Sequence, residues 1–167
     1  MIHTDRPKIK VPFTPFDMII ECMSVLLIIG IWAHLIVAYG DLPETVPSHF
    51  DASGKADGYS KKAFVFFIPI LTTVMYIGLF ILSKYPHLHN YMINITEENA
   101  PRQYRFAVTT LRILNFLVVL MFAYINYQIL KGAVSGTTDI GMGFLITVIA
   151  ASIVLPLIML YFQKKLK

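Results

Sequence analysis

The chain has 167 residues, of which 56% are hydrophobic and 14% are charged, and its mean hydropathy is +0.65. A soluble domain carries roughly 25% charged residues, so most of this chain cannot face water. The single cysteine, Cys22, excludes a disulfide within the chain. The net charge of +4 does not indicate nucleic acid as a partner, because the basic residues flank apolar runs, as they do in oriented membrane proteins.

Four apolar runs predict an all-α, polytopic membrane protein whose four transmembrane helices form a bundle. Each run is close to the roughly 20 residues that cross the hydrocarbon core as a helix. The runs are continuous, whereas the strands of a β-barrel would be shorter and alternating. We predict spans over 16–39, 63–83, 106–130 and 140–162 within a transmembrane domain over 16–162, with basic tails over 1–15 and 163–167.

The distribution of basic residues predicts the orientation. Nine of the 14 Lys and Arg residues lie in the two tails and in the 84–105 connector, and four lie in the other two loops. The positive-inside rule therefore places both termini in the cytoplasm and the 40–62 loop outside. In the 84–105 connector, Thr96 followed by two acids predicts the cap of a helix that leads into the third span.

The 40–62 loop is punctuated by proline and glycine, which fix turns through their backbone geometry, so we predict an ordered loop. Ser60 is expected to cap the second span. Asp57 is expected to contact Lys61, because a cation at a helix start needs a compensating charge.

The loop also has some features of a calcium-binding loop, but a lysine stands at one ligand position and no closing glutamate follows. His49, Asp51 and Asp57 therefore remain only weak metal-ligand candidates. The alternative for His49 is a loop-packing role with a hydrogen-bonded imidazole.

Between Leu42 and Lys62 the chain reads Leu-Pro-x-x-Val-Pro-x-His-Phe-x-x-x-Gly-x-x-Asp-Gly-Tyr-x-x-Lys. This pattern resembles the signature of the bacterial membrane family called domain of unknown function 1648, the N-terminal domain of SdpI-type immunity proteins. The stretch from Ile95 to Arg105 is also similar to these proteins. The resemblance implies a bacterial cytoplasmic (inner) membrane location. We expect the chain to lack the additional C-terminal membrane domain of SdpI-type proteins.

SdpI-type proteins protect a cell from a secreted peptide toxin and can signal by holding a repressor at the membrane. The resemblance therefore implies that the loop recognises a partner, with a peptide toxin or another membrane protein as the candidates. The residues expected to form this recognition loop are His49, Phe50, Asp51, Gly54, Asp57, Gly58, Tyr59 and Lys61.

Polar residues inside the predicted spans are the other candidate site, because ionisable groups in hydrocarbon are costly. Glu21 and Arg112 lie near the same membrane boundary, and we expect them to pair. His34 and Asn126 lie 13 and 14 residues further along, about 20 Å deeper at 1.5 Å per residue, and we expect a second contact there. Asn115 shares a helical face with Arg112 and Asn126.

We call these two depths, the first with Glu21 and Arg112 and the second with His34 and Asn126, the polar levels. They have three interpretations: contacts that fasten two helices, a path for protons or substrate, or snorkelling towards the headgroups. In the fourth span, Gly143, Thr147 and Ala151 repeat every four residues and predict a closely packed helix face.

We find no catalytic, phosphate-binding or dinucleotide motif, and the sequence predicts neither a catalytic residue nor a cofactor. The leading hypothesis is a non-enzymatic membrane protein that acts in envelope recognition, toxin immunity or signalling through the 40–62 loop. The alternative is a small membrane enzyme, or a transporter-like or accessory subunit, that uses the intramembrane polar residues. The sequence names neither the ligand nor the oligomeric state.

Overall fold

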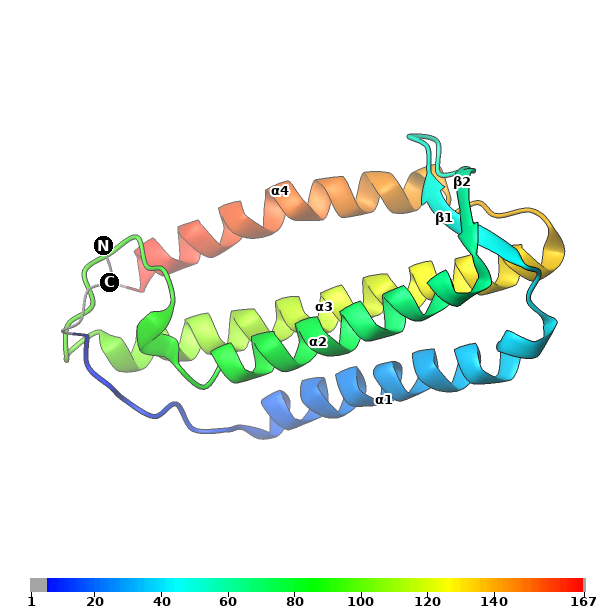
Figure 1. Cartoon of the computed structure of the whole chain (residues 1–167). Helices are drawn as coiled ribbons and strands as arrows, with labels where there is room; N and C mark the ends of the chain where they lie inside the picture. The colour runs from blue at the N-terminus through cyan, green and yellow to red at the C-terminus, as the bar shows by residue number, and fades with distance from the viewer. Residues whose placement is uncertain (1–5, 167) are drawn as a thin grey trace.

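A computed structural model describes residues 6–166 and contains four long helices that run side by side (Figure 1). Each is long and apolar enough to cross a membrane, which confirms the predicted all-α polytopic fold. The third helix is the longest and begins before the predicted span over 106–130. The helices are α1 (Pro15–Ala38), α2 (Phe67–Leu82), α3 (Ala100–Ser135) and α4 (Met142–Lys165).

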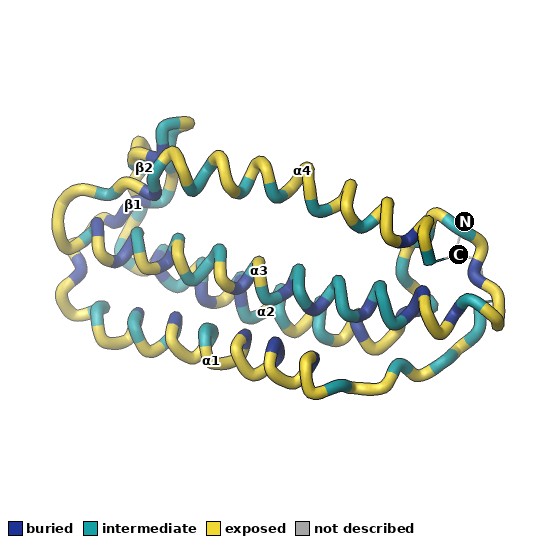
Figure 2. Tube along the Cα trace, turned by 180° about the vertical axis from the view of Figure 1, so that it is seen from behind, coloured by how far each residue is buried: buried dark blue, intermediate teal, exposed yellow. Residues whose placement is uncertain are grey.

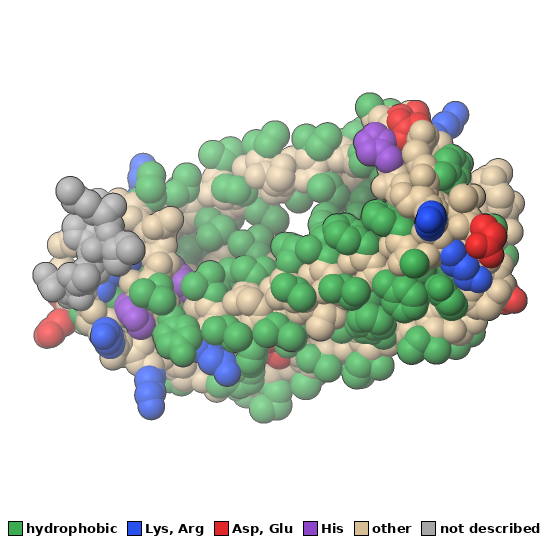
Figure 3. All heavy atoms as spheres, viewed as in Figure 1, with side chains coloured by type: hydrophobic (Ala, Val, Ile, Leu, Met, Phe, Trp, Pro, Cys, Tyr) green, Lys and Arg blue, Asp and Glu red, His purple; other side chains and the backbone are tan. Residues whose placement is uncertain are grey.

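The two ends of the bundle differ in charge from its long sides. Hydrophobic side chains cover the sides, and charged side chains gather mostly at the ends (Figure 3). Exposed positions also run along the whole length of α1 and α4 (Figure 2). Apolar side chains are stable in this position when lipid surrounds the bundle. We call the end where Arg6 and Gln163 lie the terminal end, and the opposite end, where the loop between α1 and α2 forms a β-hairpin, the hairpin end.

Helix α1 begins with a complete capping box. The Thr14 hydroxyl accepts a hydrogen bond from the Asp17 backbone N–H, and the Thr14 backbone N–H donates to the Asp17 carboxylate at 2.8 Å. Pro15 occupies the first turn, where its missing N–H costs nothing. Helix α1 packs mainly against α3.

The loop between α1 and α2 is an antiparallel β-hairpin of β1 (Thr45–Phe50) and β2 (Ala56–Lys61), followed by a 3₁₀ turn over Lys62–Phe66. Ser60 lies within β2, where its hydroxyl donates to Ser48 Oγ at 2.8 Å, so the prediction that Ser60 caps α2 was wrong. The base of the hairpin packs into an apolar cluster with α1 and α3, which contains Leu35, Leu42, Val46, Val65 and Leu130.

The tip of the hairpin is joined to the loop between α3 and α4. The Ala56 N–H donates to the Thr138 carbonyl at 3.2 Å, and the Ile140 N–H donates to the Gly54 carbonyl at 2.9 Å. Gly132 permits this approach, because a Cβ at that position would lie 2.6 Å from Thr138 Cβ. The hairpin is therefore held at its base and at its tip.

At the terminal end, the segment before α1 lies against the connector between α2 and α3. Arg6 donates to the carbonyls of His87 and His89, and the Tyr104 hydroxyl donates to the Pro7 carbonyl at 2.9 Å. Helix α3 is preceded by Asn99 and not by Thr96, whose hydroxyl instead accepts from the Asn99 N–H, because the chain makes one more turn before the helix begins.

Helix α4 meets α3 at its two ends and is separated from it between them. At the terminal end Gln103 donates to the Gln163 carbonyl at 3.2 Å, and at the hairpin end the rings of Tyr124 and Phe144 stack 4.5 Å apart. Figure 3 shows the opening between these contacts. A groove of about 700 Å³ runs there and is lined in part by Thr147 and Ala151. The predicted close packing of this small-residue face was therefore wrong.

Candidate functional site

The hairpin presents one continuous polar face. Side chains of alternate residues in a strand point to the same side, and Asp57, Tyr59 and Lys61 are the exposed set of β2. His49 of β1 is exposed beside them, and its Nδ1 lies 2.5 Å from Asp57 Oδ1. We call these four residues, His49, Asp57, Tyr59 and Lys61, the outward face.

The His49–Asp57 contact depends on Gly58. Gly58 pairs with His49 in the register of the hairpin, and a Cβ on Gly58 would lie 2.8 Å from His49 Cβ. No salt bridge joins Asp57 to Lys61 within residues 6–166, so that prediction was wrong. The register shifts between His49 and Phe50 and leaves Asp57 without a cross-strand partner, and its carboxylate contacts His49 instead of Lys61.

The other predicted recognition residues build the hairpin. Phe50 is half-buried at the end of β1, and Gly54 is buried at the tip with φ +88°, against the backbone of Gly141. The carboxylate of Asp51 accepts from the Ser53 hydroxyl at 2.7 Å and from two backbone N–H groups, and these bonds lower its pKa. Asp51 is therefore committed to the turn. Among the described residues, no three His, Cys, Asp or Glu side chains are grouped as a metal site.

A comparison with protein families finds one model that matches residues 26–73, and its description is a domain of unknown function, DUF1648. This segment is therefore similar to the DUF1648 family. It consists of the second half of α1, the hairpin, the 3₁₀ turn and the first turns of α2. The predicted family resemblance is thereby confirmed over this stretch, which contains the whole outward face.

A protein of Archaeoglobus fulgidus, described as uncharacterized, is 26% identical to the chain over 73 residues. The aligned stretch covers 44% of this chain and 40% of that relative. The chain thus spans about two fifths of the length of the curated relative it matches. No solved structure matches the chain.

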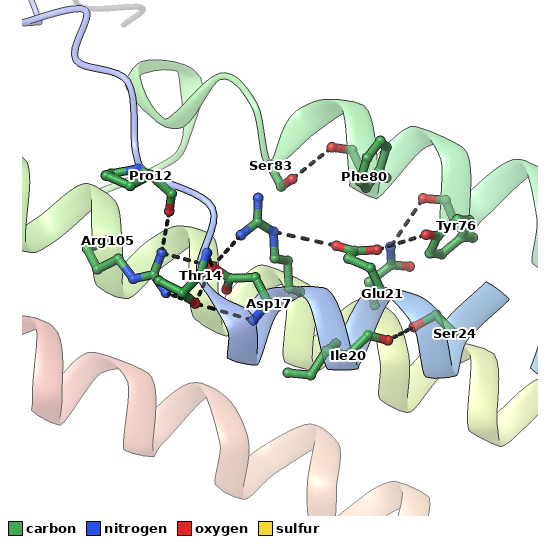
Figure 4. A network of polar contacts seen from close by, with 12 residues as sticks. Pro12, Thr14, Asp17, Ile20, Glu21, Ser24, Tyr76, Phe80, Ser83 and Arg105 are labelled. Carbon is green, nitrogen blue, oxygen red and sulfur yellow. Dashed lines mark hydrogen bonds and ion pairs between the residues drawn. The ribbon is translucent and has the colours of Figure 1, made fainter. Parts of the chain in front are cut away.

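Outside the matched segment, a cluster of four charged side chains joins α1 to α3 at the terminal end (Figure 4). Its centre is Asp17, which is fully buried and which the sequence analysis missed as a charged site. Asp17 Oδ2 lies 2.9 Å from Arg105 Nη1 and 2.9 Å from Arg112 Nη1, and it accepts the Thr14 hydroxyl at 2.7 Å. The signal was available, because Asp17 is the third residue after the threonine of a capping box.

The predicted pairing of Glu21 with Arg112 is confirmed, with Glu21 Oε1 3.5 Å from Arg112 Nε. Glu21 Oε2 also accepts the Tyr76 hydroxyl at 2.8 Å, and the Asn115 amide donates to the Tyr76 carbonyl at 3.1 Å, so α2 joins the same cluster. Arg112 Nε and Nη1 make no aligned hydrogen bond, so their contacts with Asp17 and Glu21 are charge contacts. Two acids thus balance two arginines between three helices.

At the second polar level, His34 and Asn126 line one groove between α1 and α3, but no hydrogen bond joins them in the described part of the chain. The His34 ring stacks on Tyr127, with centroids 5.7 Å apart. The predicted His34–Asn126 contact was therefore wrong in its partner, because α3 presents Tyr127 to the imidazole.

Proposed function

We propose that this protein is a non-enzymatic envelope protein that binds an extracytoplasmic partner with the outward face of its hairpin. The observation that carries the proposal is the exposed His49–Asp57 pair next to Tyr59, which is 62% exposed, on a hairpin held at base and tip. A fixed loop loses little conformational entropy on binding. Aromatic side chains and fully desolvated charged pairs carry much of the energy of protein interfaces.

The resemblance to SdpI-type proteins favours a secreted peptide toxin as the partner, with immunity or signalling as the outcome. The family match adds support, because it covers the outward face and excludes Asp17, Glu21 and Arg112. Those three residues are occupied by contacts between helices, which favours a structural role for them over a proton or substrate path.

The orientation is tested first. We expect both termini in the cytoplasm and the hairpin outside, from the bias of the basic residues. In a Cys22→Ser background, Ala52→Cys at the exposed hairpin tip should react with an impermeant maleimide in intact cells, and Glu98→Cys in the connector should react only after permeabilisation. The reverse pattern would end the proposal.

The function is tested in a strain that lacks the gene, challenged with the secreted peptides of its own culture and of neighbouring strains. We expect the wild-type gene to restore growth, and His49→Ala or Asp57→Ala to abolish this protection while the protein still accumulates in the membrane. Glu44→Ala is the matched control, because Glu44 is an exposed acidic residue of the same loop that precedes β1 and is not part of the outward face. Full protection by the His49 and Asp57 variants, with severe loss in Glu21 or His34 variants, would favour the enzyme or transporter alternative.

A further inference from the structure

The groove between α1 and α3 has at one end an amide side chain without a hydrogen-bond partner among the described residues. It has a volume of about 500 Å³ and opens sideways, where lipid would lie. The Asn126 side chain lines it, is 3% exposed, and makes no hydrogen bond within residues 6–166. Its polar atoms are not among the fully enclosed ones, so the amide is accessible from the groove and a ligand there can form a hydrogen bond with it.

The polar and apolar parts of this groove are segregated along its length. His34 and Asn126 lie towards the hairpin end, with His34 about 6 Å, or four residues, before the end of α1. From there the α1 side continues through Gly30, Leu27 and Leu26 to Met23, about 16 Å further into the membrane. A molecule with a polar head at the membrane boundary and an apolar chain below it matches this order.

A positive charge stands beyond the polar end. Lys131 is exposed on α3, about 7 Å nearer the hairpin end than Asn126, with its Nζ 5.7 Å from the centre of the Tyr127 ring. A head group held by Asn126 and His34 would therefore meet a cation next, and an anionic group would gain from it.

The wider groove between α3 and α4 has no such feature. The hydroxyls of Tyr124, Thr147 and Ser152 in its lining all donate to backbone carbonyls. The α3–α4 groove therefore favours an apolar occupant, such as lipid chains.

We propose that the α1–α3 groove binds one anionic lipid from the leaflet at the hairpin end. Its head group bonds to Asn126 and His34 next to Lys131, and one acyl chain lies along α1 over Gly30 towards Met23. The site is separate from the outward face, so the proposal stands whether or not the hairpin binds a toxin.

The test uses the full chain in phosphatidylcholine vesicles that contain a minor fraction of phosphatidylglycerol, with a photoreactive diazirine in the acyl chain of one lipid or the other. We expect the phosphatidylglycerol probe to label the Met23–Gly30 stretch several-fold more than the phosphatidylcholine probe does. Asn126→Leu should bring the two probes to nearly equal labelling, because one hydrogen bond to a charged group is worth roughly tenfold in affinity. Ser152→Ala, in the other groove, should leave the excess of phosphatidylglycerol labelling unchanged.

A second variant keeps the test decisive if Asn126→Leu fails to fold. A Cβ on Gly30 meets no atom within 4 Å, so Gly30→Leu fills the groove without displacing the protein. It should remove the label from both probes and leave thermal stability intact. Equal labelling by the two probes in the wild type, labelling that survives Gly30→Leu, or cross-links between two copies at Met23 would each overturn the proposal.

Discussion

Replacing Asp17 by Asn tests the charged cluster most directly. Asn keeps an oxygen that can accept from Thr14, but it removes the negative charge that lies 2.9 Å from both Arg105 and Arg112. Arg112 is 6% exposed, so it would keep only Glu21, at 3.5 Å, as a counter-charge. Breaking a buried pair costs roughly 3–5 kcal/mol. Because Glu21 remains, we expect the lower part of that range, about 3 kcal/mol of unfolding free energy.

Two further variants separate the contribution of the Asp17 charge to the unfolding free energy from that of the helix cap. Thr14→Ala removes the capping hydroxyl and leaves the ion contacts, so it should cost about 1 kcal/mol. Glu21→Gln should cost less than Asp17→Asn, because the amide oxygen can still accept the Tyr76 hydroxyl and Arg112 keeps Asp17.

The assay is unfolding in mixed micelles with increasing dodecyl sulfate, followed by the fluorescence of Trp32. Trp32 is the one tryptophan of the chain, and its Nε1 donates to Thr73 Oγ1 on α2 at 3.1 Å, so its emission reports the separation of α1 from α2. The reasoning fails if Asp17→Asn costs no more than Glu21→Gln. It also fails if the losses from Asp17→Asn and Arg112→Gln simply add, because residues in contact should show a coupling energy.

Two further predictions concern the hairpin end. Gly132→Ala should lower the unfolding free energy by roughly 1–3 kcal/mol through overlap with Thr138, whereas Gly143→Ala, where a Cβ meets open space, should be neutral or stabilising in the same assay. Hydrogen bonds from the Ser53 hydroxyl and the Lys55 N–H hold the pKa of Asp51 below its ordinary value of 3.8. The slow amide hydrogen exchange of Lys55 should therefore persist down to pH 3.8 and be lost as the pH falls further, whereas Asp51→Asn should exchange with no such step, and a loss above pH 3.8 would contradict the assignment.

The helices could be predicted from sequence because lipid imposes a simple requirement on each of them. About 20 apolar residues must satisfy their own backbone hydrogen bonds, and each of the four runs meets that condition independently of its neighbours. Depth matching along the helices also predicted Glu21 and Arg112 as partners. It could not show that Asp17 approaches Arg112 more closely, because that depends on the rotation of α1 about its axis.

The hairpin and the position of α4 depend on contacts between segments distant in the sequence. Side-chain burial alternates over Ala56–Lys61 in the structure. In the sequence, however, Pro47 and two glycines favour turns over strands. The hydrogen bonds that join the hairpin tip to the loop around Thr138 connect residues more than 80 positions apart. The small residues of α4 predicted close packing, but α4 contacts α3 near its two ends and a groove separates the two helices between these contacts.

The order in which the ribosome makes these residues adds a constraint on biogenesis. Asp17 is synthesised 88 residues before Arg105, and Glu21 is synthesised 91 residues before Arg112. At roughly 5–20 residues per second, α1 waits on the order of 5–20 seconds for its counter-charges. During that interval two carboxylates must stay near the aqueous boundary or in the insertion machinery. The first helix is thus the first to be made, but it can reach its final depth only after the third has entered the membrane.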